Sequence, residues 1–413
     1  MTLPKLGRLL LITTMIFVLA NYLPEFYWLK FDTPVSKPIV NYSPVLNKFM
    51  IGRYDGIEFG WKDDDNKKYT RDEYEIYCPA SNYRQLLFDK KLPDSINGEK
   101  MDLDSLRLHR IMMRITPQII NSWQIPLYPL LESESGRIKL AMPDDFFRID
   151  DKGITFINAE KNQIDEEKSR VFTEVMRKKK FQFPVKLIAG NPSTMKPFDE
   201  GYFILDSMGN LFHLKMVKGK PFFTFTSNPI GTRIKHILFQ ETNLRSFYGF
   251  AITEDNRFFC ILTDDYKFLQ LPVDDYNFNE NKFVYMGDYL NKNLLVESDK
   301  IVTDYVTDRN HRFIKKYENL YYDGSKDAAI SAANILFPYT ISFVDANSGM
   351  VDIFFKLSNL SALWGIAISM ILSFVILRKR RKAAHGFDYA DIMIVALSGI
   401  YGLIAVILIK NVD

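Results

Sequence analysis

A run of five basic residues near the C-terminus lies between two stretches that carry no charge. The run is Arg378-Lys379-Arg380-Arg381-Lys382, and the uncharged stretches are 357–377 and 392–409. A helix needs about 20 apolar residues to cross a hydrocarbon core about 30 Å thick, so each stretch is long enough to span a membrane. Short loops rich in Lys and Arg stay in the cytoplasm. The run therefore predicts a cytoplasmic loop over 378–390, with a membrane helix on each side.

The N-terminal segment fits the same orientation. Lys5 and Arg8 precede the apolar residues 9–23, and aromatic side chains follow them. Basic residues on the cytoplasmic side and aromatic residues at the outer interface are typical of a membrane anchor. A cleaved signal peptide is the alternative, because Val18-Leu19-Ala20 resembles a cleavage site after a short apolar core. Either outcome exports the residues that follow.

The predicted organisation has three membrane helices, one N-terminal and two C-terminal, and one large exported domain. In chain order, its parts are a cytoplasmic N-terminus over 1–8, a membrane helix over 9–23, an extracytoplasmic domain over 24–356, a second membrane helix over 357–377, a basic cytoplasmic loop over 378–390, a third membrane helix over 391–410 and an extracytoplasmic tail over 411–413.

The distribution of charge along the chain agrees with this topology. The whole chain carries a formal charge of +3, and the predicted cytoplasmic parts hold seven basic and two acidic residues, so the remainder carries about −2. An exported domain without a positive field has no electrostatic footprint for nucleic acid. We therefore expect the lipid bilayer as a partner, and no nucleic acid.

The exported domain has the pattern of an antiparallel β protein. Short apolar runs, many of them aromatic, are separated by turns rich in Asp, Asn and Gly, which predicts β-hairpins. The expected hairpins have their turns at 134–136, 150–153, 206–210, 254–256, 308–310 and 345–349. Several of these turns recur at intervals close to those of propeller blades, although too irregularly to prove a repeat. We expect a mainly β, propeller-like domain, with a β-sandwich as the rival.

A few helices are expected at the periphery of this domain. Thr70 and Glu73 form the spacing of a capping box, and a second helix start follows at Ser81 or Asn82. A third helix is predicted from Asn162, where acidic residues come first and the basic residues 177–180 close it, which suits the helix dipole.

No motif for catalysis or cofactor binding occurs in the sequence. The patterns of zinc proteases, serine hydrolases and nucleotide-binding loops are absent, and the five histidines are not spaced as metal ligands. Cys78 and Cys260 are far apart in sequence, so pairing and two buried free thiols both remain open. We expect no enzyme activity, no cofactor and no metal.

Two sets of residues are candidate interaction sites. If residues 106–115 were a helix, Arg107, Arg110 and Arg114 would share one face, which would suit an anionic ligand or lipid headgroups. Small residues recur on the two C-terminal membrane helices, and such faces permit close helix contact and predict docking to an integral membrane partner. They are Ser361, Gly365, Ser369 and Ser373 on the first and Ser398 and Gly402 on the second.

Three segments carry a resemblance to a known family. They are 92–96, 188–203 and 211–215, which include Lys196-Pro197-Phe198-Asp199-Glu200-Gly201-Tyr202 and Leu211-Phe212-His213-Leu214-Lys215. The chain resembles a family of uncharacterised bacterial membrane proteins of about this length. The resemblance implies a place in the bacterial inner membrane with the main domain in the periplasm, and an accessory role beside ABC-type transporters. It implies no catalytic or binding residue.

These expectations give three hypotheses of function. The leading one is a membrane-anchored extracytoplasmic binding or accessory module that associates with a transport complex of ABC type. The second is an envelope ligand sensor that relays its state through a membrane partner. The third is an envelope hydrolase or lyase, which no motif supports.

Overall fold

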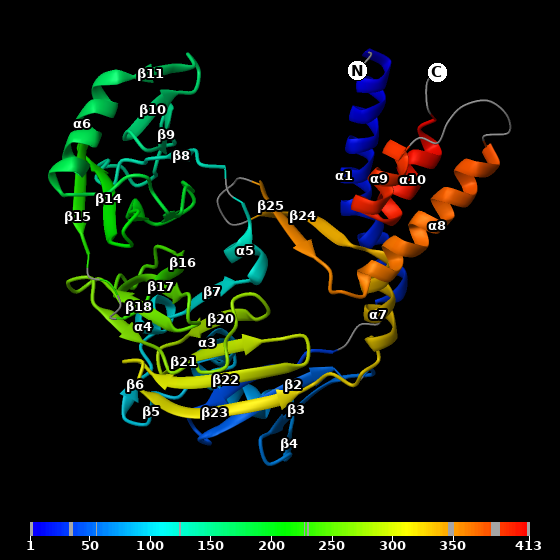
Figure 1. Ribbon diagram of the computed structural model, residues 1–413. Coiled ribbons are helices and arrows are strands. Elements are labelled where there is room, and N and C mark those ends of the chain that lie inside the picture. Colours follow the sequence, from blue (N-terminus) through cyan, green and yellow to red (C-terminus); the bar gives the residue numbers. More distant parts are fainter. Residues whose placement is uncertain are drawn as a thin grey trace. The chain divides into compact units, whose positions relative to one another are not determined.

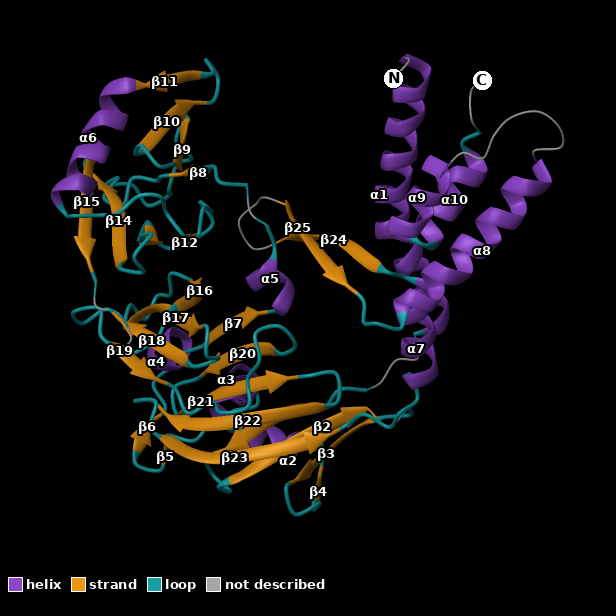
Figure 2. Cartoon of the chain, viewed as in Figure 1, coloured by secondary structure: helices purple, strands orange, loops and turns teal. Residues whose placement is uncertain are grey.

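The structure is a computed structural model (Figure 1) that describes all residues except 1–2, 33–35, 55, 124, 227, 229–230, 346–350, 381–388 and 411–413. The chain divides into two compact units. The helical unit comprises 1–35, 322–344 and 352–413, and the sheet unit comprises 36–321 and 345–351. The mainly β domain that the sequence predicts is confirmed by the strands of the sheet unit (Figure 2).

Antiparallel sheets of consecutive strands make up the sheet unit. The first sheet is β1 (Ile39–Ser43), β2 (Lys48–Tyr54), β3 (Phe59–Asp63) and β4 (Lys68–Tyr69). The second is β8 (Tyr128–Pro129), β9 (Asp145–Ile149), β10 (Ile154–Asn158) and β11 (Gln163–Asp165). The third is β12 (Leu187–Gly190), β13 (Tyr202–Leu205), β14 (Leu211–Val217) and β15 (Lys220–Phe225).

The fourth and fifth sheets follow the same plan. The fourth is β16 (Ile234–Phe239), β17 (Phe247–Thr253), β18 (Phe258–Leu262) and β19 (Phe268–Gln270). The fifth is β20 (Lys282–Gly287), β21 (Asn291–Glu297), β22 (Ile301–Asp308) and β23 (Phe313–Leu320), to which β7 (Ile111–Ile115) pairs from earlier in the chain. A small pair, β5 (Ser95–Ile96) and β6 (Glu99–Lys100), lies apart from them.

The cores of the sheet unit lie between successive sheets. Because side chains alternate across a strand, β13 directs Tyr202 toward the second sheet and Phe203 toward the fourth. The ring of Tyr202 lies 5.3 Å from that of Phe147, and the ring of Phe203 lies 5.7 Å from that of Phe239. A strand buried on both faces needs apolar residues at successive positions, which is the pattern of β13.

The propeller-like arrangement is not confirmed. In the described part of the chain, the sheets pack in series but do not close into a barrel or a propeller. The hairpins β9–β10, β13–β14, β17–β18 and β22–β23 match their predicted turns. The predicted turn at 345–349 falls, apart from Asp345, outside the described residues, between β24 (Tyr339–Asp345) and β25 (Val351–Leu357).

One predicted hairpin, around 134–136, is wrong. Only Tyr128–Pro129 is a strand there, and it pairs with β9. Glu132 instead accepts hydrogen bonds from the backbone N–H groups of Lys218 and Gly219, in the turn between β14 and β15. The segment around Glu132 therefore binds a turn of the third sheet. The local sequence pattern gives no sign of this partner, which lies far away in the sequence.

The predicted helices are present, although not all of them start at the predicted residue. Thr70 and Glu73 form the capping box of α2 (Arg71–Tyr77). The next helix, α3 (Pro79–Phe88), starts at a proline, which is well suited to the first turn, and it is kinked at Asn82, whose φ of −109° and ψ of 15° are not helical. The predicted start at Ser81 or Asn82 therefore coincides with this kink. Residues 163–165 pair with β10, so α6 (Glu166–Lys178) starts with Asp165 as its N-cap.

The helical unit contains α1 (Leu3–Phe31), α7 (Asp327–Leu336), α8 (Ala362–Arg380), α9 (Tyr389–Ser398) and α10 (Ile400–Leu408), with most of the β24–β25 hairpin. Of the helices in the described ranges, only α1 is long and apolar enough to cross a membrane. The prediction of three membrane helices is therefore not supported.

The two C-terminal spans differ from the prediction for local reasons. β25 continues to Leu357 and α8 starts at Ala362, so the apolar part of this helix, 362–377, is about 24 Å long at 1.5 Å per residue. That length is short of a hydrocarbon core of about 30 Å. The predicted span over 391–410 is interrupted at Gly399, whose φ of 56° and ψ of −128° separate α9 from α10.

The helices α9 and α10 form a hairpin beside α1. Arg8 donates to the carboxylate of Asp391, near the start of α9, and to the carbonyl of Ile409, just after α10, at 2.8 and 3.2 Å. The two outer ends of the hairpin therefore lie together at the N-terminal end of α1. Near the turn, Tyr401 packs in a cluster with Ala20, further along α1. Residues 411–413 lie outside the described chain.

Candidate functional site

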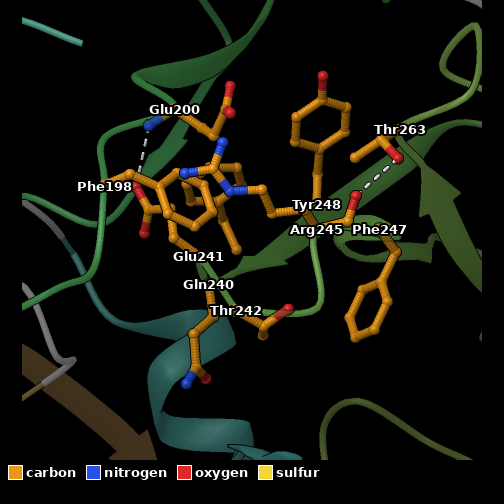
Figure 3. A pocket seen from close by; sticks show the side chains of 10 residues that line it. Phe198, Glu200, Gln240, Glu241, Thr242, Arg245, Phe247, Tyr248 and Thr263 are labelled. Atoms are coloured by element: carbon orange, nitrogen blue, oxygen red, sulfur yellow. Dashed lines mark hydrogen bonds between the residues drawn. The ribbon is translucent and has the colours of Figure 1, made fainter. Parts of the chain in front are cut away.

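A pocket is formed by residues of the third and fourth sheets and their loops (Figure 3). The space inside it that could hold a water-sized molecule is about 20 Å³. Its walls combine aromatic rings with polar and charged side chains: Phe198, Glu200, Phe239, Gln240, Glu241, Thr242, Arg245, Phe247, Tyr248 and Thr263.

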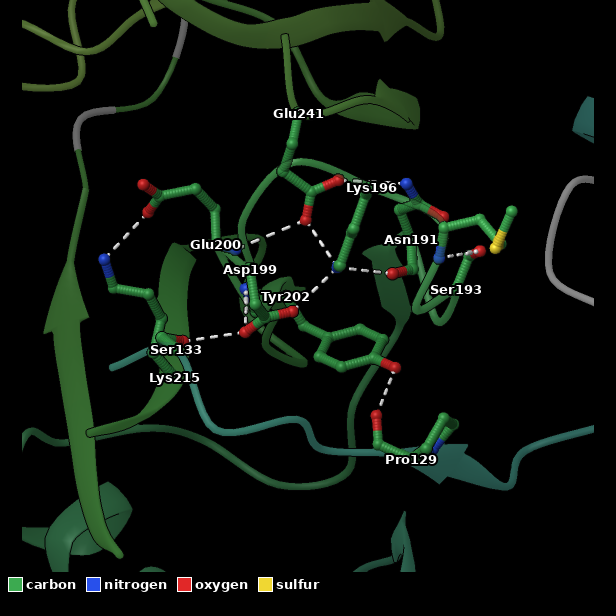
Figure 4. A network of polar contacts seen from close by, with 12 residues as sticks. Pro129, Ser133, Asn191, Ser193, Lys196, Asp199, Glu200, Tyr202, Lys215 and Glu241 are labelled. Atoms are coloured by element: carbon green, nitrogen blue, oxygen red, sulfur yellow. Dashed lines mark hydrogen bonds and ion pairs between the residues drawn. The ribbon is translucent and has the colours of Figure 1, made fainter. Parts of the chain in front are cut away.

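Lys196 fixes one wall of this pocket (Figure 4). Its ammonium lies 2.7 Å from a carboxylate oxygen of Asp199 and 2.5 Å from one of Glu241, and it donates to the carbonyl of Asn191 at 2.6 Å. The three charged side chains are almost fully buried, at 3%, 1% and 0% exposure. A buried charge is costly unless it is paired. Lys196 thus ties the loop between β12 and β13 to the loop after β16.

Both oxygens of Glu241 are occupied. One accepts from Asn191 Nδ2 at 3.0 Å, and the other accepts from Lys196 and from the backbone N–H of Glu200 at 3.2 Å. Burial raises the pKa of the Glu241 carboxyl, and Lys196 opposes this shift. Glu241 therefore serves as an acceptor that holds the wall in place.

The adjoining turn depends on Gly201. Its φ of 64° lies in the region that favours glycine, and a Cβ atom there would lie 2.1 Å from the carbonyl oxygen of Leu214. Asp199 accepts from the Gly201 N–H at 3.1 Å and from the hydroxyl of Ser133 at 2.7 Å. This turn places Phe198 and Glu200 in the pocket wall.

His213 supports Glu200 from within the core. Its Nε2 lies 2.5 Å from the carbonyl oxygen of Glu200, so this nitrogen carries the proton, and Nδ1 accepts from the hydroxyl of Tyr266 at 2.9 Å. Complete burial lowers the pKa of His213 to about 3. The imidazole is therefore neutral, and it acts as a structural donor within β14.

Arg245 contributes a cation to the pocket. Its guanidinium carbon lies 3.7 Å from the centre of the Phe198 ring, which is a close cation–π stack. Within the described residues, this guanidinium forms no ion pair. By contrast, the carboxylate of Glu200 lies 2.8 Å from the ammonium of Lys215.

Thr242 contributes a hydroxyl that has no partner among the described residues. The side-chain oxygen is buried, and the residue as a whole is 7% exposed. A buried hydroxyl without a hydrogen bond costs about 1–3 kcal/mol, so such groups mark places where water or a ligand completes the bonding.

The carboxylates of Glu200 and Glu241 are both paired with lysines. In the part of the chain that the structure describes, no group of His, Cys, Asp and Glu side chains could hold a metal ion.

The predicted arginine patch is not a helix face. Arg107 lies in α4 (Leu103–Leu108), Arg110 follows that helix, and Arg114 lies in β7. The alternating burial of Ile111, Met112, Met113, Arg114 and Ile115 makes this segment a strand. All three arginines are exposed, but they belong to different elements.

The small residues of the C-terminal helices pack within the helical unit. A Cβ atom on Gly365 would lie 1.8 Å from the carbonyl oxygen of Ile335, and one on Gly402 would lie 2.2 Å from the hydroxyl of Ser398. Ser369, Ser373 and Ser398 are buried, whereas Ser361 precedes α8 and is half-buried. The close contacts expected of these faces are thus made inside the chain, and docking to a partner stays a prediction.

The other sequence-predicted residues carry less information. Of the basic run, Arg378 is exposed, Lys379 and Arg380 lie in α8, and Arg381 and Lys382 lie outside the described residues. Cys78 and Cys260 are free and buried, which decides between the two alternatives left open.

Sequence reasoning missed the pocket. The segment 196–202 was singled out only for its family resemblance, although its mixture of Lys, Asp, Glu and Gly beside buried strands is unusual for a simple turn. The partners Glu241, Thr242 and Arg245 come from a loop some 40 residues later, and no local pattern connects the two segments.

Comparisons with known proteins identify a family but no activity. No curated protein matches the chain. Among solved structures, it is similar to PorZ, described as an essential bacterial surface component of the type-IX secretion system of Porphyromonas gingivalis, with 12% identity and a TM-score of 0.21. That match covers 71% of this chain and 28% of PorZ, so the chain spans less than a third of that protein. Over residues 39–307 the chain matches a family model, and it belongs to the family described as a domain of unknown function (DUF4857).

Proposed function

We propose that this protein is a membrane-anchored binding module whose sheet unit holds a small ligand in the pocket of Figure 3. The observation that carries the proposal is the buried Thr242 hydroxyl, which lacks a partner in the described chain and lines a pocket with aromatic walls. Small-molecule sites combine apolar walls with a few polar groups in this way.

The helical unit supports the anchoring role. Large apolar side chains on α1 and α8 are exposed, among them Leu10 at 60%, Leu11 at 61%, Trp364 at 71% and Ile371 at 64%. Exposure of this extent is unfavourable in water, but it carries no such cost when the side chains contact the hydrocarbon of a bilayer. We propose that α1 crosses the inner membrane, that α8 lies in the same bilayer, and that α9–α10 is a re-entrant hairpin covered by α1.

The orientation follows from charge. Lys5, Arg8 and the basic run that starts at Arg378 favour a cytoplasmic location for the N-terminal end of α1 and the C-terminal end of α8. We propose that the sheet unit lies on the periplasmic side. As an accessory of an ABC-type transport complex, the module would contact its membrane partner through the exposed face of α8, because the small residues within α8, α9 and α10 are buried.

Two alternatives remain as proposals of lower rank. An envelope sensor would use the same pocket and relay its state through a membrane partner. An envelope hydrolase or lyase is less favoured, because the pocket carboxylates are paired with lysines.

The test uses the full chain. The protein is expected in the membrane fraction, resistant to alkaline extraction, and its thermal midpoint in mild detergent is expected to rise with at least one member of a panel of small amphipathic metabolites. Thr242→Trp, which fills the pocket, should abolish that rise, whereas Thr263→Ser, at the pocket edge, should keep it. An equal rise in Thr242→Trp, or no rise with any compound, would contradict the binding function.

A further inference from the structure

We propose that the β24–β25 hairpin is a membrane-surface element whose apolar face enters the lipid at the outer boundary of the bilayer. This inference rests on the membrane anchor of the proposed function and adds a second contact with the same bilayer. It begins with the two-residue period of the hairpin. The odd-numbered positions over 339–343 and 353–357 are all apolar or aromatic: Tyr339, Ile341, Phe343, Ile353, Phe355 and Leu357. Of the even-numbered positions whose side chains are described, Thr340, Ser342 and Lys356 are polar, and Phe354 is the exception.

Part of this apolar face packs on α1. Successive side chains of a strand point to opposite faces, so the odd-numbered positions share one face. Ile341 is buried in a cluster with Ala20 of α1, and Tyr339 and Ile353 pack against the same cluster. The side-chain amide of Asn21 donates to the carbonyl of Ile341 at 2.9 Å. The hairpin is therefore fixed on α1 through its apolar face.

The remainder of the same face is uncovered. The ring of Phe343 lies 6.1 Å from that of Phe17 in α1, and the ring of Phe355 lies 5.3 Å from that of Tyr339. In spite of these contacts, Phe343 is 52% exposed, Phe355 53% and Leu357 69%. Large apolar side chains exposed together are unfavourable in water. This part of the face therefore needs a further apolar cover.

The uncovered side chains continue into the surface that the proposed anchor assigns to lipid. Leu360, just before α8, is exposed, and so is Trp364 in its first turn. Trp is enriched where a membrane meets water, because its ring is apolar and its N–H group is polar. Since α8 is proposed to lie in the bilayer, lipid already adjoins the end of β25, and lipid is the cover that we assign to the hairpin.

The level of the hairpin along α1 fits the membrane boundary. The uncharged part of α1, 9–24, is about 24 Å long at 1.5 Å per residue. Asn21 and Phe17, which contact the hairpin, lie about 5 and 10 Å inside the outer end of this part. An interfacial element typically buries its apolar face by about 5–10 Å. In the described chain β24 and β25 pair only with each other, and their outer backbone edges, which hydrocarbon would not tolerate, stay at the level of the headgroups.

Spin labels at adjacent positions of β25 test this contact. The full chain is placed in nanodiscs of phosphatidylethanolamine and phosphatidylglycerol, with a nitroxide at Phe355→Cys on the apolar face or at Lys356→Cys on the opposite face. Oxygen concentrates in lipid and a nickel chelate stays in water. Oxygen should therefore relax the label at 355 more strongly than the chelate does, the order should be reversed at 356, and Leu357→Cys should behave like Phe355→Cys. The unsubstituted chain is the labelling blank, because Cys78 and Cys260 are buried.

Ile371→Cys, at an exposed position of α8, is the control for the anchor itself. If oxygen reaches the label at 371 while the chelate reaches the label at 355, the hairpin lies in water; the inference is then overturned and the anchor stands. A label at 355 that neither reagent reaches means that protein covers the face, which also overturns the inference. If the chelate reaches the label at 371 as well, the anchor of the proposed function has failed. Thermal midpoints equal to that of the unsubstituted chain would show that the variants fold.

Discussion

The guanidinium of Arg8 holds the carboxylate of Asp391, 383 positions later in the chain, through two hydrogen bonds of 2.8 and 3.0 Å. The same guanidinium donates to the carbonyl of Ile409 at 3.2 Å. One side chain near the start of α1 therefore binds both outer ends of the α9–α10 hairpin. A helix that crossed the membrane over 391–410 would place these two ends on opposite sides.

The position of Lys410 tests the hairpin directly. In intact cells, a membrane-impermeant maleimide is expected to leave Lys410→Cys unlabelled, as it leaves Lys5→Cys, and to label both after permeabilisation. Met195→Cys, on a side chain that is 94% exposed in the sheet unit, should be labelled from outside. Labelling of Lys410→Cys from outside would support one crossing helix instead.

Removal of Arg8 should destabilise the helical unit. Asp391 is 3% exposed in its side chain, so Arg8→Met leaves a buried carboxylate without its counter-ion, at a cost of about 3–5 kcal/mol. We expect a lower thermal midpoint in detergent, largely restored in the double variant Arg8→Met/Asp391→Leu. A double variant no more stable than Arg8→Met would show that the ion pair is not the cause.

The turn at Gly399 should not tolerate a side chain. Its φ is 56°, and a Cβ atom would lie 3.2 Å from Cγ of Pro338. Backbone strain of this kind costs about 1–3 kcal/mol, so Gly399→Ala should lower the thermal midpoint. Gly7→Ala in α1 is the control, because a Cβ atom there has no neighbour within 4 Å. Equal effects of the two substitutions would argue against a strained turn.

Substitution of Lys196 should destabilise the sheet unit more than most other substitutions. Lys196→Met leaves the buried carboxylates of Asp199 and Glu241 without their shared cation, which should cost about 3–5 kcal/mol near neutral pH. The defect should shrink in acid as Glu241, whose pKa burial raises, becomes protonated. Lys267→Met, which breaks an exposed pair with Asp264, should have little effect. The measurement is thermal unfolding of each variant at several pH values, and a pH-independent defect would contradict this explanation.

His213 should make the protein less stable in mild acid. Burial lowers the pKa of His213 to about 3, below that of an unfolded histidine, so the unfolded chain binds the proton first and stability falls as pH drops below about 6.5. From pH 7 to pH 5 this residue alone should cost about 2 kcal/mol.

The control for this prediction is His213→Gln, which can still donate to the Glu200 carbonyl. Chemical denaturation of the full chain at several pH values should give a shallower pH dependence for the variant. His236 and His311, each with a pKa lowered by burial to about 4, should keep the remainder of the slope. An unchanged slope would mean that His213 is not protonated on unfolding.

Local patterns predicted the elements well where the partner is near in sequence. The hairpin around 206–210 and the capping box of Thr70 and Glu73 depend on residues within a few positions, and both are present. Local sequence patterns failed where residues far away in the sequence determine the local structure. The stretch over 392–409 carries no charge, and the structure divides it at Gly399 into α9 and α10.

The sequence by itself determined that a β-rich domain is joined to an apolar N-terminal helix, because hydrophobic period and turn residues act over short distances. The sequence also identified the segment 196–202 by its family resemblance, but it did not reveal that this segment contributes to the pocket wall. The tertiary structure alone decided how the sheets pack, which acids Lys196 neutralises, and that the Thr242 hydroxyl has no hydrogen-bond partner in the described chain. The physical reason is that burial and charge pairing depend on neighbours in space, and these come from loops that lie far apart in the sequence.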